Sequence, residues 1–299
     1  MMRKIPSGVF GLNPLMDGGI NERTVSVVIG APGAGKTTFA INFLRRGLEQ
    51  GEDAIFITLD EAPEQIVQEV IQMGWEDAQQ HLDDGSMVFI DASGKQFTNF
   101  IQKELGAFVG EWTGHNARIV IDPLTPVLWS VKERYEQRDI VSYLLRETRK
   151  IGTVLCTLEE HGIQGDLAAP ELVIPMYLAD NVIHLRYKSH ESPEKREMKI
   201  IKCRSSKHSR YWHPYRIVKG AGIIIQHASE EFAPAEKRVD FKMELKKQLG
   251  KVKAERLEAM HPMERDAMLH TLDSLANEDL SDLDPREVVT RILEEHGLI

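Results

Sequence analysis

The nine residues GAPGAGKTT, positions 30–38, limit the possible folds of this chain more than any other stretch. They follow the apolar segment VSVVI and precede FAINFLRRGLEQG, which has helical spacing. The pattern GxxxxGK[ST] has structural meaning in this setting, between a strand and a helix. Glycines let backbone N–H groups curl around phosphate oxygens, where side chains would block the approach. The chain is therefore predicted to contain a strand, a phosphate-binding loop and a helix, in that order.

The residues of this loop have distinct expected roles. Lys36 is expected to reach the β and γ phosphates of ATP and to take part in catalysis, and the Thr37 hydroxyl is expected to bind Mg²⁺. The amino end of the following helix adds a positive potential. The alternative is a glycine-rich turn without a ligand, which the flanking strand and helix disfavour. The residues predicted to surround the nucleotide are Gly30, Ala31, Pro32, Gly33, Ala34, Gly35, Lys36, Thr37 and Thr38.

Segments of strand and helix spacing alternate through the first 160 residues. Short apolar segments at 53–59, 87–91, 118–122 and 152–158 read as strands, and helical spacing lies between them, as in PEQIVQEVIQMG. This alternation predicts an α/β fold with a mainly parallel central sheet. After residue 180, NVIHLRY, MKIIKCR, YRIV and GIIIQ follow one another with short connections. These segments predict antiparallel strands added late to one side of the sheet.

The composition changes beyond about residue 228. From Pro262 onward there are ten acidic residues and three basic ones. Apolar stripes and one N-terminal capping pattern predict two or three helices there. We therefore expect an α/β domain at 1–228 and an acidic helical C-terminal extension at 229–299. The stripes are Leu245, Leu249 and Val252, then Met268, Leu272 and Leu275, and the capping pattern is Asp284, Pro285 and Glu287.

Polar residues follow several predicted strands where each strand ends. Because the carboxyl ends of parallel strands meet at one edge of a sheet, these residues are expected beside the phosphate loop. Asp122 is predicted to hold Mg²⁺ or its water, and Asp60 or Glu61 to orient and deprotonate the attacking water. Alternatively, Asp122 is an ordinary turn residue and one of the acidic pair caps the next helix. Thr157 either senses the γ phosphate or is a satisfied strand-end hydroxyl.

A cationic segment follows another apolar strand. KIIKCRSSKHSRYW, residues 199–212, contains Lys202, Arg204 and His208 at spacings of two and four. Alternation along a strand places Lys202 and Arg204 on the same side. Two neighbouring cations repel each other unless an anion lies between them, and a triphosphate is such an anion. The alternatives are a solvated basic edge or a nucleic-acid-binding patch.

Bulk composition narrows the classes of function. The formal net charge is −9, which argues against non-specific nucleic-acid binding because phosphate neutralisation supplies most of that affinity. No apolar run reaches the roughly 18 to 20 residues that a bilayer requires, and the first residues lack the apolar core of a signal peptide. The two cysteines, Cys156 and Cys203, form no CxxC pair and are expected to be reduced. We expect a cytoplasmic protein without membrane or nucleic-acid partners.

The run IPSGVFGLNPLMDGGINERTVSVVIGAPGAGKTTFA resembles the entry segment of KaiC-like ATPases of the RecA superfamily. The family prelude is matched by Pro6, Gly8, Gly11, Gly18 and Gly19, but Asn13 stands where the family usually has aspartate. TLDEAPEQI resembles the family strand that ends in two glutamates, with Asp60 at the position of the usual catalytic base. VIDPLT resembles the magnesium-binding strand end. The resemblance covers roughly residues 4–226, implies a RecA-like core in a single-domain member, and does not extend to the C-terminal extension.

In KaiC-like proteins a Lys-x-Arg-x-x-x-His segment reaches the γ phosphate bound by the neighbouring subunit, and Lys202, Arg204 and His208 match it. The resemblance therefore implies a homo-oligomer, expected to be a hexameric ring with ATP between subunits. Because Asp60 is shorter than glutamate, either Asp60 is the base with adjusted geometry, or Glu61 takes over, or hydrolysis is slow; a slow rate is expected. Self-phosphorylation after the fifth strand is not expected, because residues 158–180 contain no serine or threonine.

Three functions are compatible with these features. The first is a ring ATPase whose ATP state regulates a protein partner, bound through the C-terminal extension. The second is a RecA/RadA-like DNA-binding recombination accessory protein. Against it, residues 161–179, where such proteins place a DNA-contacting loop, contain no lysine or arginine. The third is a scaffold that binds ATP without hydrolysing it.

Overall fold

The fold is that of a computed structural model, which describes residues 3–94, 97, 99–161, 166–189, 192–226, 247, 250, 254–275 and 285–298. A nine-stranded sheet of order β11-β10-β9-β8-β3-β7-β6-β4-β5 forms its centre, beside a separate β1-β2 pair. The strands are β1 Lys4–Ile5, β2 Ile20–Asn21, β3 Val25–Gly30, β4 Asp53–Thr58, β5 Met87–Asp91, β6 Ala117–Asp122, β7 Gly152–Glu159, β8 Asn181–Ser189, β9 Ser192–Cys203, β10 His213–Val218 and β11 Gly222–Ile225.

Six neighbouring strands, from β8 through β3 to β5, are parallel, and β9, β10 and β11 continue the sheet in antiparallel fashion. Central strands such as β3 and β6 are buried along their whole length, as expected for parallel strands covered on both faces. The α/β fold class predicted from the sequence is confirmed. One detail differs: the first of the four late strands, β8, is parallel to β3, because helix α8 carries the chain back across the sheet.

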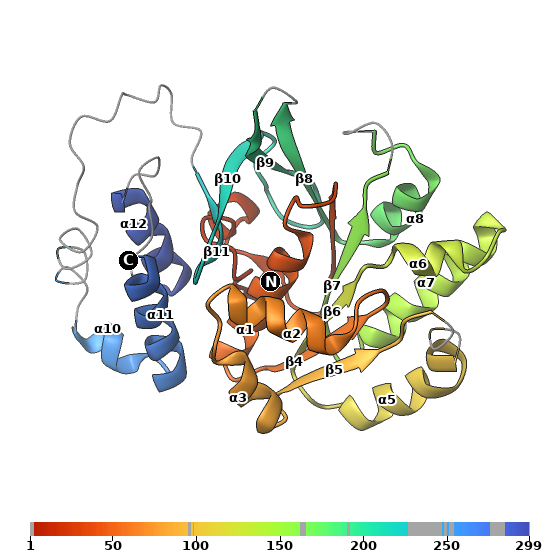
Figure 1. Ribbon diagram of the computed structural model, residues 1–299, viewed down its shortest axis with the longest axis horizontal. Helices are drawn as coiled ribbons and strands as arrows, with labels where there is room; N and C mark the ends of the chain where they lie inside the picture. The colour runs from red at the N-terminus through yellow and green to blue at the C-terminus, as the bar shows by residue number, and fades with distance from the viewer. Residues whose placement is uncertain are drawn as a thin grey trace.

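Helices cover both faces of the sheet (Figure 1). One apolar cluster joins α1, α2 and α3 to the first face, and a second joins α5, α6, α7 and α8 to the opposite face. None of the helices in the described part of the chain is long and apolar enough to span a membrane. The helices are η1 Asn13–Met16, α1 Lys36–Glu49, α2 Pro63–Gln72, α3 Ala78–Asp83, η2 Phe100–Glu104, α5 Leu105–Trp112, α6 Thr125–Trp129, α7 Arg134–Thr148, α8 Pro170–Leu178, α10 Ala254–Ala259, α11 Pro262–Leu275 and α12 Pro285–Glu295.

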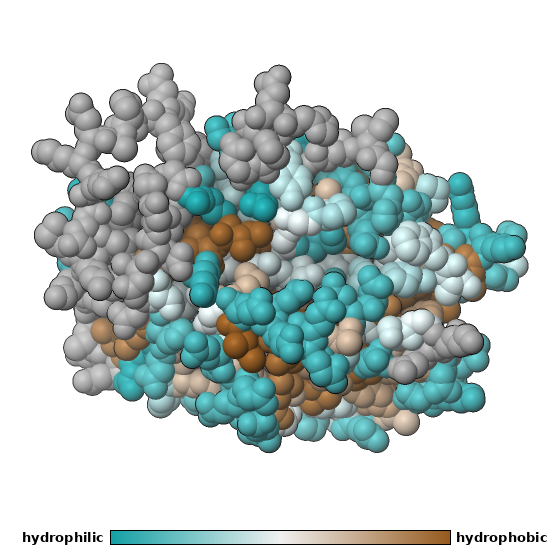
Figure 2. Space-filling view, in the orientation of Figure 1, coloured by the Kyte–Doolittle hydropathy of each residue, from teal (hydrophilic) through white to brown (hydrophobic). Residues whose placement is uncertain are grey.

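The C-terminal helices lie beside the β10–β11 edge of the sheet (Figure 1). The N-terminal segment bonds to the outer side of β11, where Phe10 exchanges two backbone hydrogen bonds with Ile223 and Ile225. A third apolar cluster then joins α11 and α12 to this region. Where Figure 2 colours the surface by hydropathy, hydrophilic residues cover most of this face and smaller hydrophobic patches lie between them.

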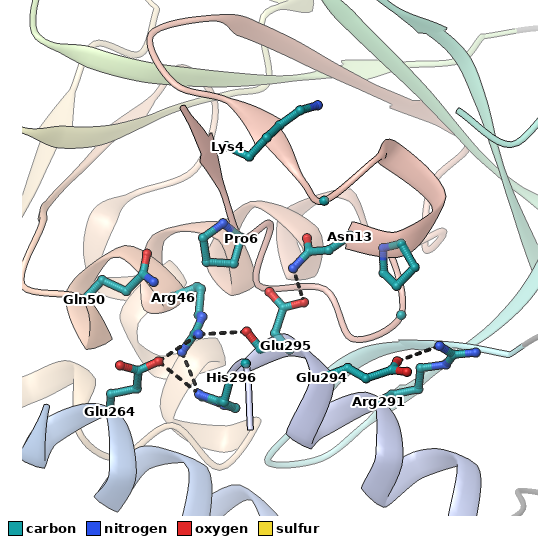
Figure 3. A pocket seen from close by; sticks show the side chains of 14 residues that line it. Lys4, Pro6, Asn13, Arg46, Gln50, Glu264, Arg291, Glu294, Glu295 and His296 are labelled. Atoms are coloured by element: carbon teal, nitrogen blue, oxygen red, sulfur yellow. Dashed lines mark hydrogen bonds and ion pairs between the residues drawn. The ribbon is translucent and has the colours of Figure 1, made fainter. Parts of the chain in front are cut away.

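A network of charged side chains also ties the C-terminal helices to α1 (Figure 3). Arg46 of α1 is only 4% exposed and donates to the backbone oxygen of Glu295 at 2.9 Å. It also lies 2.9 Å from a Glu264 oxygen and 2.7 Å from Nδ1 of His296. These contacts border a cavity of about 420 Å³ between the N-terminal segment and the C-terminal helices. The cavity is lined by residues of those segments and of the C-terminal end of α1, and none of its lining residues belongs to the phosphate loop.

Asn13 links the same helices to the entry segment. Its Oδ1 accepts a hydrogen bond from the Ser7 backbone at 2.9 Å, and its Nδ2 donates to Oε2 of Glu295 at 2.5 Å (Figure 3). The backbone N–H of Gly8 donates to the other Glu295 oxygen at 3.1 Å. An aspartate at position 13 would put a second carboxylate against Glu295. The departure from the family pattern at this position therefore has a physical reason in the docked α12.

Two parts of the C-terminal prediction have different outcomes. Helices α11 and α12 contain the predicted stripe of Met268, Leu272 and Leu275 and the predicted helix start at Pro285. The stripe of Leu245, Leu249 and Val252 and the boundary predicted at residue 228 lie outside the described residues.

Candidate nucleotide site

The phosphate loop connects the end of β3 to the start of α1. Gly33 and Gly35 adopt positive φ angles of 74° and 92°, which glycine accommodates most readily. A Cβ at Gly30 would lie 2.8 Å from the backbone oxygen of Leu185, and one at Gly33 would lie 2.7 Å from the hydroxyl of Tyr187. The loop thus forms a tight cradle that requires glycine at these positions.

Side chains from the late strands hold this loop in place. The hydroxyl of Tyr215 on β10 donates to the carbonyl of Ala34 at 2.5 Å, and that of Tyr187 on β8 donates to Pro32 at 3.2 Å. Arg196 of β9 donates to the carbonyl of Gly33 at 3.3 Å. The sequence reading missed these supports, since nothing in the local pattern of β8, β9 or β10 indicates that they reach the loop.

Asp122 lies beside the loop at the end of β6. Its side chain accepts hydrogen bonds from the hydroxyls of Thr157 and Thr37. Burial raises the pKa of Asp122, whereas these two hydrogen bonds and Lys36 lower it in part. The structure thus brings together three predicted site residues, and a buried carboxylate next to a threonine hydroxyl is a donor set that suits Mg²⁺.

Lys36 begins α1, and its Nζ donates to the carbonyl of Ala31 at 3.2 Å. Burial lowers the pKa of the Lys36 ammonium, and Asp122, Glu159 and Glu160 act in the opposite direction. The sequence reading did not single out Glu159 and Glu160. They directly follow the apolar strand GTVLCTL, so the rule that led to Asp60 and Asp122 would also have found them.

Glu159 and Glu160 differ in their surroundings. Glu160 is buried and pairs with His184 of β8, with Oε2 3.1 Å from Nε2. Glu159 is partly exposed and lies 3.6 Å from Nε2 of His161. Glu159 also contributes to raising the pKa of Asp122. The carboxyl edge of the sheet therefore carries more negative charge around the phosphate loop than the sequence reading assigned to it.

Asp60 and Glu61 follow β4, the neighbour of β6, and both are exposed. The Thr58 hydroxyl donates to the backbone carbonyl of Glu61 at 2.6 Å and fixes the chain at this turn. Partial desolvation of the Glu61 carboxyl raises its pKa although the residue is exposed overall, and Glu69, Asp122 and Asp60 add to the effect. Asp60 and Glu61 therefore lie at the same carboxyl edge of the sheet as Asp122, whose negative charge raises the pKa of Glu61.

The cationic segment 202–208 lies at the amino ends of the parallel strands, whereas the phosphate loop of the same chain lies at their carboxyl ends. Gly30 pairs with Leu185 of β8, whereas Cys203 pairs with Asn181 at the start of that strand. The two positions are four residues apart along β8, which is about 13 Å at a rise of about 3.3 Å per residue. This is farther than an arginine side chain extends, so the segment does not reach the phosphates bound by its own chain.

Within the chain, the side chains of Lys202 and Arg204 contact the end of α8. Both donate to the carbonyl of Tyr177, at 3.2 Å and 3.1 Å. His208 is half-buried in the segment that follows β9. Helix α8 itself was not predicted, because the sequence reading treated residues 161–179 as a loop. The structure therefore does not bring Lys202, Arg204 and His208 together with Lys36.

The fold and the site together define a nucleotide-binding protein of the P-loop class. The described residues contain no cluster of three or more His, Cys, Asp or Glu side chains arranged for a metal ion. The glycine cradle suits the phosphates of a nucleotide.

Residues 5–230 match the KaiC ATPase family, and the chain belongs to this family. Membership implies ATP binding, and it confirms the resemblance noted in the sequence. The chain is 28% identical to circadian clock protein KaiC3 of Synechocystis over 233 residues, which are 75% of this chain and 46% of that protein. It is 27% identical to a UPF0273 protein of Pyrococcus furiosus over 241 residues, which are 75% of this chain and 94% of the relative.

A solved structure is also similar. The crystal structure of a KaiC-like protein of Pyrococcus horikoshii OT3 matches with a TM-score of 0.62 and 26% identity, and the match covers 76% of this chain and all of that one. The alignment with KaiC3 spans about half the length of that protein. The match to the solved structure and the alignment with the P. furiosus protein each leave about a quarter of the present chain unmatched.

Proposed function

We propose that the chain is a Mg²⁺-dependent ATPase that assembles with copies of itself, in a ring expected to be hexameric, and hydrolyses ATP slowly at sites shared by two subunits. Its ATP state would regulate a protein partner. The observation that carries this proposal is the position of the cationic segment 202–208 at the opposite edge of the sheet from the phosphate loop. Cations placed there serve a phosphate only when it belongs to another subunit.

The chemistry follows from the carboxyl edge of the sheet. The loop and Lys36 would bind the phosphates, while Thr37 and Asp122 would hold Mg²⁺, which neutralises charge between the β and γ phosphates when bound. A carboxylate must then take a proton from the attacking water. Glu61 has a pKa raised by partial desolvation and by neighbouring acids, which is the direction that makes a general base more effective near neutral pH. We propose Glu61, with Asp60 beside it, for this role.

The cationic pair would complete the site from the neighbouring subunit. Arg204 is 53% exposed, so its guanidinium is accessible to a second chain. An arginine supplied in trans stabilises the charge that develops on the transferred phosphate. Thr157, which donates to Asp122, would report on the state of the γ phosphate.

Two measurements test the proposal. The mass of the full chain in solution, measured with and without ATP and Mg²⁺, should rise when both are present. Lys36→Ala alone should be inactive and Arg204→Ala alone strongly slowed but measurable, whereas a mixture should recover part of the activity because some interfaces then combine two intact halves. No recovery at any mixing ratio would contradict the shared site.

A second candidate function is an ATP-bound scaffold that does not hydrolyse. It is favoured by Asp60, which is shorter than the glutamate that the family resemblance predicts there, and by the exposure of both Asp60 and Glu61. Incubation of the purified chain with ATP and Mg²⁺, followed by separation of bound nucleotides, distinguishes the two functions. Retention of intact ATP over many hours would favour the scaffold, and conversion to ADP would favour the enzyme.

A further inference from the structure

The end of helix α8 is arranged around the two cations of the segment after β9. Lys202 Nζ donates to three carbonyls in this turn, those of Met176 at 2.9 Å, Tyr177 at 3.2 Å and Ala179 at 2.6 Å. Arg204 shares the Tyr177 carbonyl at 3.1 Å. The last carbonyls of a helix lack partners within the helix and carry partial negative charge, so they attract cations.

Asp180 completes this arrangement. Its Oδ1 lies 3.6 Å from a guanidinium nitrogen of Arg204, and its backbone carbonyl accepts the Arg204 N–H at 2.9 Å. Its Oδ2 accepts the backbone N–H of Val25 at 3.0 Å and lies 3.4 Å from Arg149. The Asp180 side chain is 11% exposed, whereas that of Arg204 is 53% exposed. A fixed carboxylate therefore holds one side of a guanidinium whose other side faces solvent.

We propose that Asp180 is a positioning residue. Together with the carbonyls of Met176, Tyr177 and Ala179 it forms an anchor, the α8 anchor, that holds Lys202 in place and orients Arg204 toward the phosphates bound by a neighbouring copy of the chain. This inference rests on the proposed shared site. It adds to it the groups that set the direction of the cationic side chains before the neighbour binds.

Two physical points support the α8 anchor. Without it, Lys202 and Arg204 would repel each other and sample many rotamers, and ordering them on binding would cost free energy. The charges are also coupled electrostatically. Burial and Arg204 lower the pKa of the Lys202 ammonium, and Asp180 raises it. The anchor thus keeps two like charges in one place and leaves Arg204 available to an incoming anion.

The test uses the full chain and steady-state ATP hydrolysis with Mg²⁺. Asp180→Asn keeps an oxygen for the Val25 N–H but removes the charge beside Arg204. We expect kcat to fall about fivefold, the upper range for a partly exposed ion pair, with KM for ATP unchanged because the phosphate loop is not touched. The matched control is Arg149→Gln, which removes the other cation on Asp180 and should leave both parameters unchanged.

A double-mutant cycle identifies the route of the effect. If Asp180 acts through Arg204, then Asp180→Asn combined with Arg204→Ala should be no slower than Arg204→Ala alone. Rate losses that multiply, or a normal kcat for Asp180→Asn, would overturn the inference while leaving the shared site intact. A normal rate for Arg204→Ala would overturn the shared site itself, and the inference with it.

A second variant covers the case in which Asp180→Asn does not fold. Arg204→Lys keeps the charge but lacks the fork that spans Tyr177 and Asp180. If the α8 anchor directs Arg204, this variant should be nearly as slow as Arg204→Ala, with a normal KM. A rate close to that of the parent chain would show that charge alone suffices and would overturn the inference.

Discussion

Replacement of Asn13 by aspartate is predicted to destabilise the folded chain, because the Asn13 amide donates a hydrogen bond to Glu295 of α12. Asn13→Asp would retain the hydrogen bond from Ser7, since Oδ1 is the acceptor there. It would replace the Nδ2 donor, now 2.5 Å from Glu295 Oε2, by a second carboxylate oxygen. Glu295 is 7% exposed, so little water is available to separate the two charges.

The size of the effect follows from the geometry. Two carboxylates whose charges are about 4 Å apart repel by about 4 kcal/mol at an effective dielectric constant of about 20. Protonation of one carboxylate sets an upper limit to this cost. A carboxyl of ordinary pKa near 4.3 lies about 2.7 pH units below pH 7, and at about 1.36 kcal/mol per unit, keeping it neutral costs about 3.7 kcal/mol. We therefore expect Asn13→Asp to lower the free energy of unfolding by about 2–4 kcal/mol at pH 7.

The pH dependence of this effect has a definite sign. In the variant the folded pair would hold a proton more tightly than the unfolded chain does, so its pKa is raised on folding. The destabilisation should be largest above that raised pKa and should shrink as the pH falls toward about 4. Burial already raises the pKa of Glu295 in the parent chain, which makes it the carboxyl expected to take the proton.

Urea unfolding at pH 7 and at pH 5 measures the effect. The decisive variant is Asn13→Asp combined with Glu295→Gln, which exchanges the amide and the carboxylate and should restore most of the lost stability. Glu294→Gln is the matched control, because Glu294 is next to Glu295 on α12 but bonds to Arg291. A loss below about 0.5 kcal/mol for Asn13→Asp, or no restoration by the exchange, would refute the reasoning.

Three further predictions concern the site and the charged network. Glu61→Gln should reduce kcat for ATP hydrolysis by about a hundredfold and Asp60→Asn by less, measured at saturating ATP; the reverse order would assign the base to Asp60. Thr157→Val should destabilise the chain by about 1–3 kcal/mol in urea unfolding, since it leaves a buried acceptor of Asp122 unpaired. Burial acts to raise the pKa of Glu264, but His296 and Arg46 outweigh this effect, so the pKa is lowered. Glu264→Gln should therefore cost about 1–3 kcal/mol at pH 7 and progressively less below pH 4.5, seen as the difference from the parent chain.

The elements that could be predicted are those set by neighbouring residues. The loop at 30–38 could be placed between a strand and a helix because the positions of its glycines and of the flanking apolar residues are local properties of the sequence. The carboxylates at positions 60, 61 and 122 follow strands, and parallel strands end at one edge whatever their order in the sheet. Helix α8 was missed because its segment contains Pro170 and Pro175 and has no clear apolar stripe.

The contacts that could not be predicted join residues far apart in the chain. Tyr187 and Tyr215 reach the phosphate loop only because β8 lies next to β3 and β10 follows β9 in the sheet. The spacing of Lys202 and Arg204 indicated a site for an anion. It did not reveal that α8 and Asp180 supply negative groups within the same chain.

The sequence by itself therefore determined the phosphate-binding loop, the α/β alternation and the family, because these depend on residue types a few positions apart. The tertiary structure decided which edge of the sheet carries the cations, what holds them, and how α12 docks on the entry segment. Those features depend on strand order and on which buried charges find partners across the chain. Asn13 shows the difference: in the sequence it is a deviation from a pattern, and in the structure it is the donor that a buried glutamate requires.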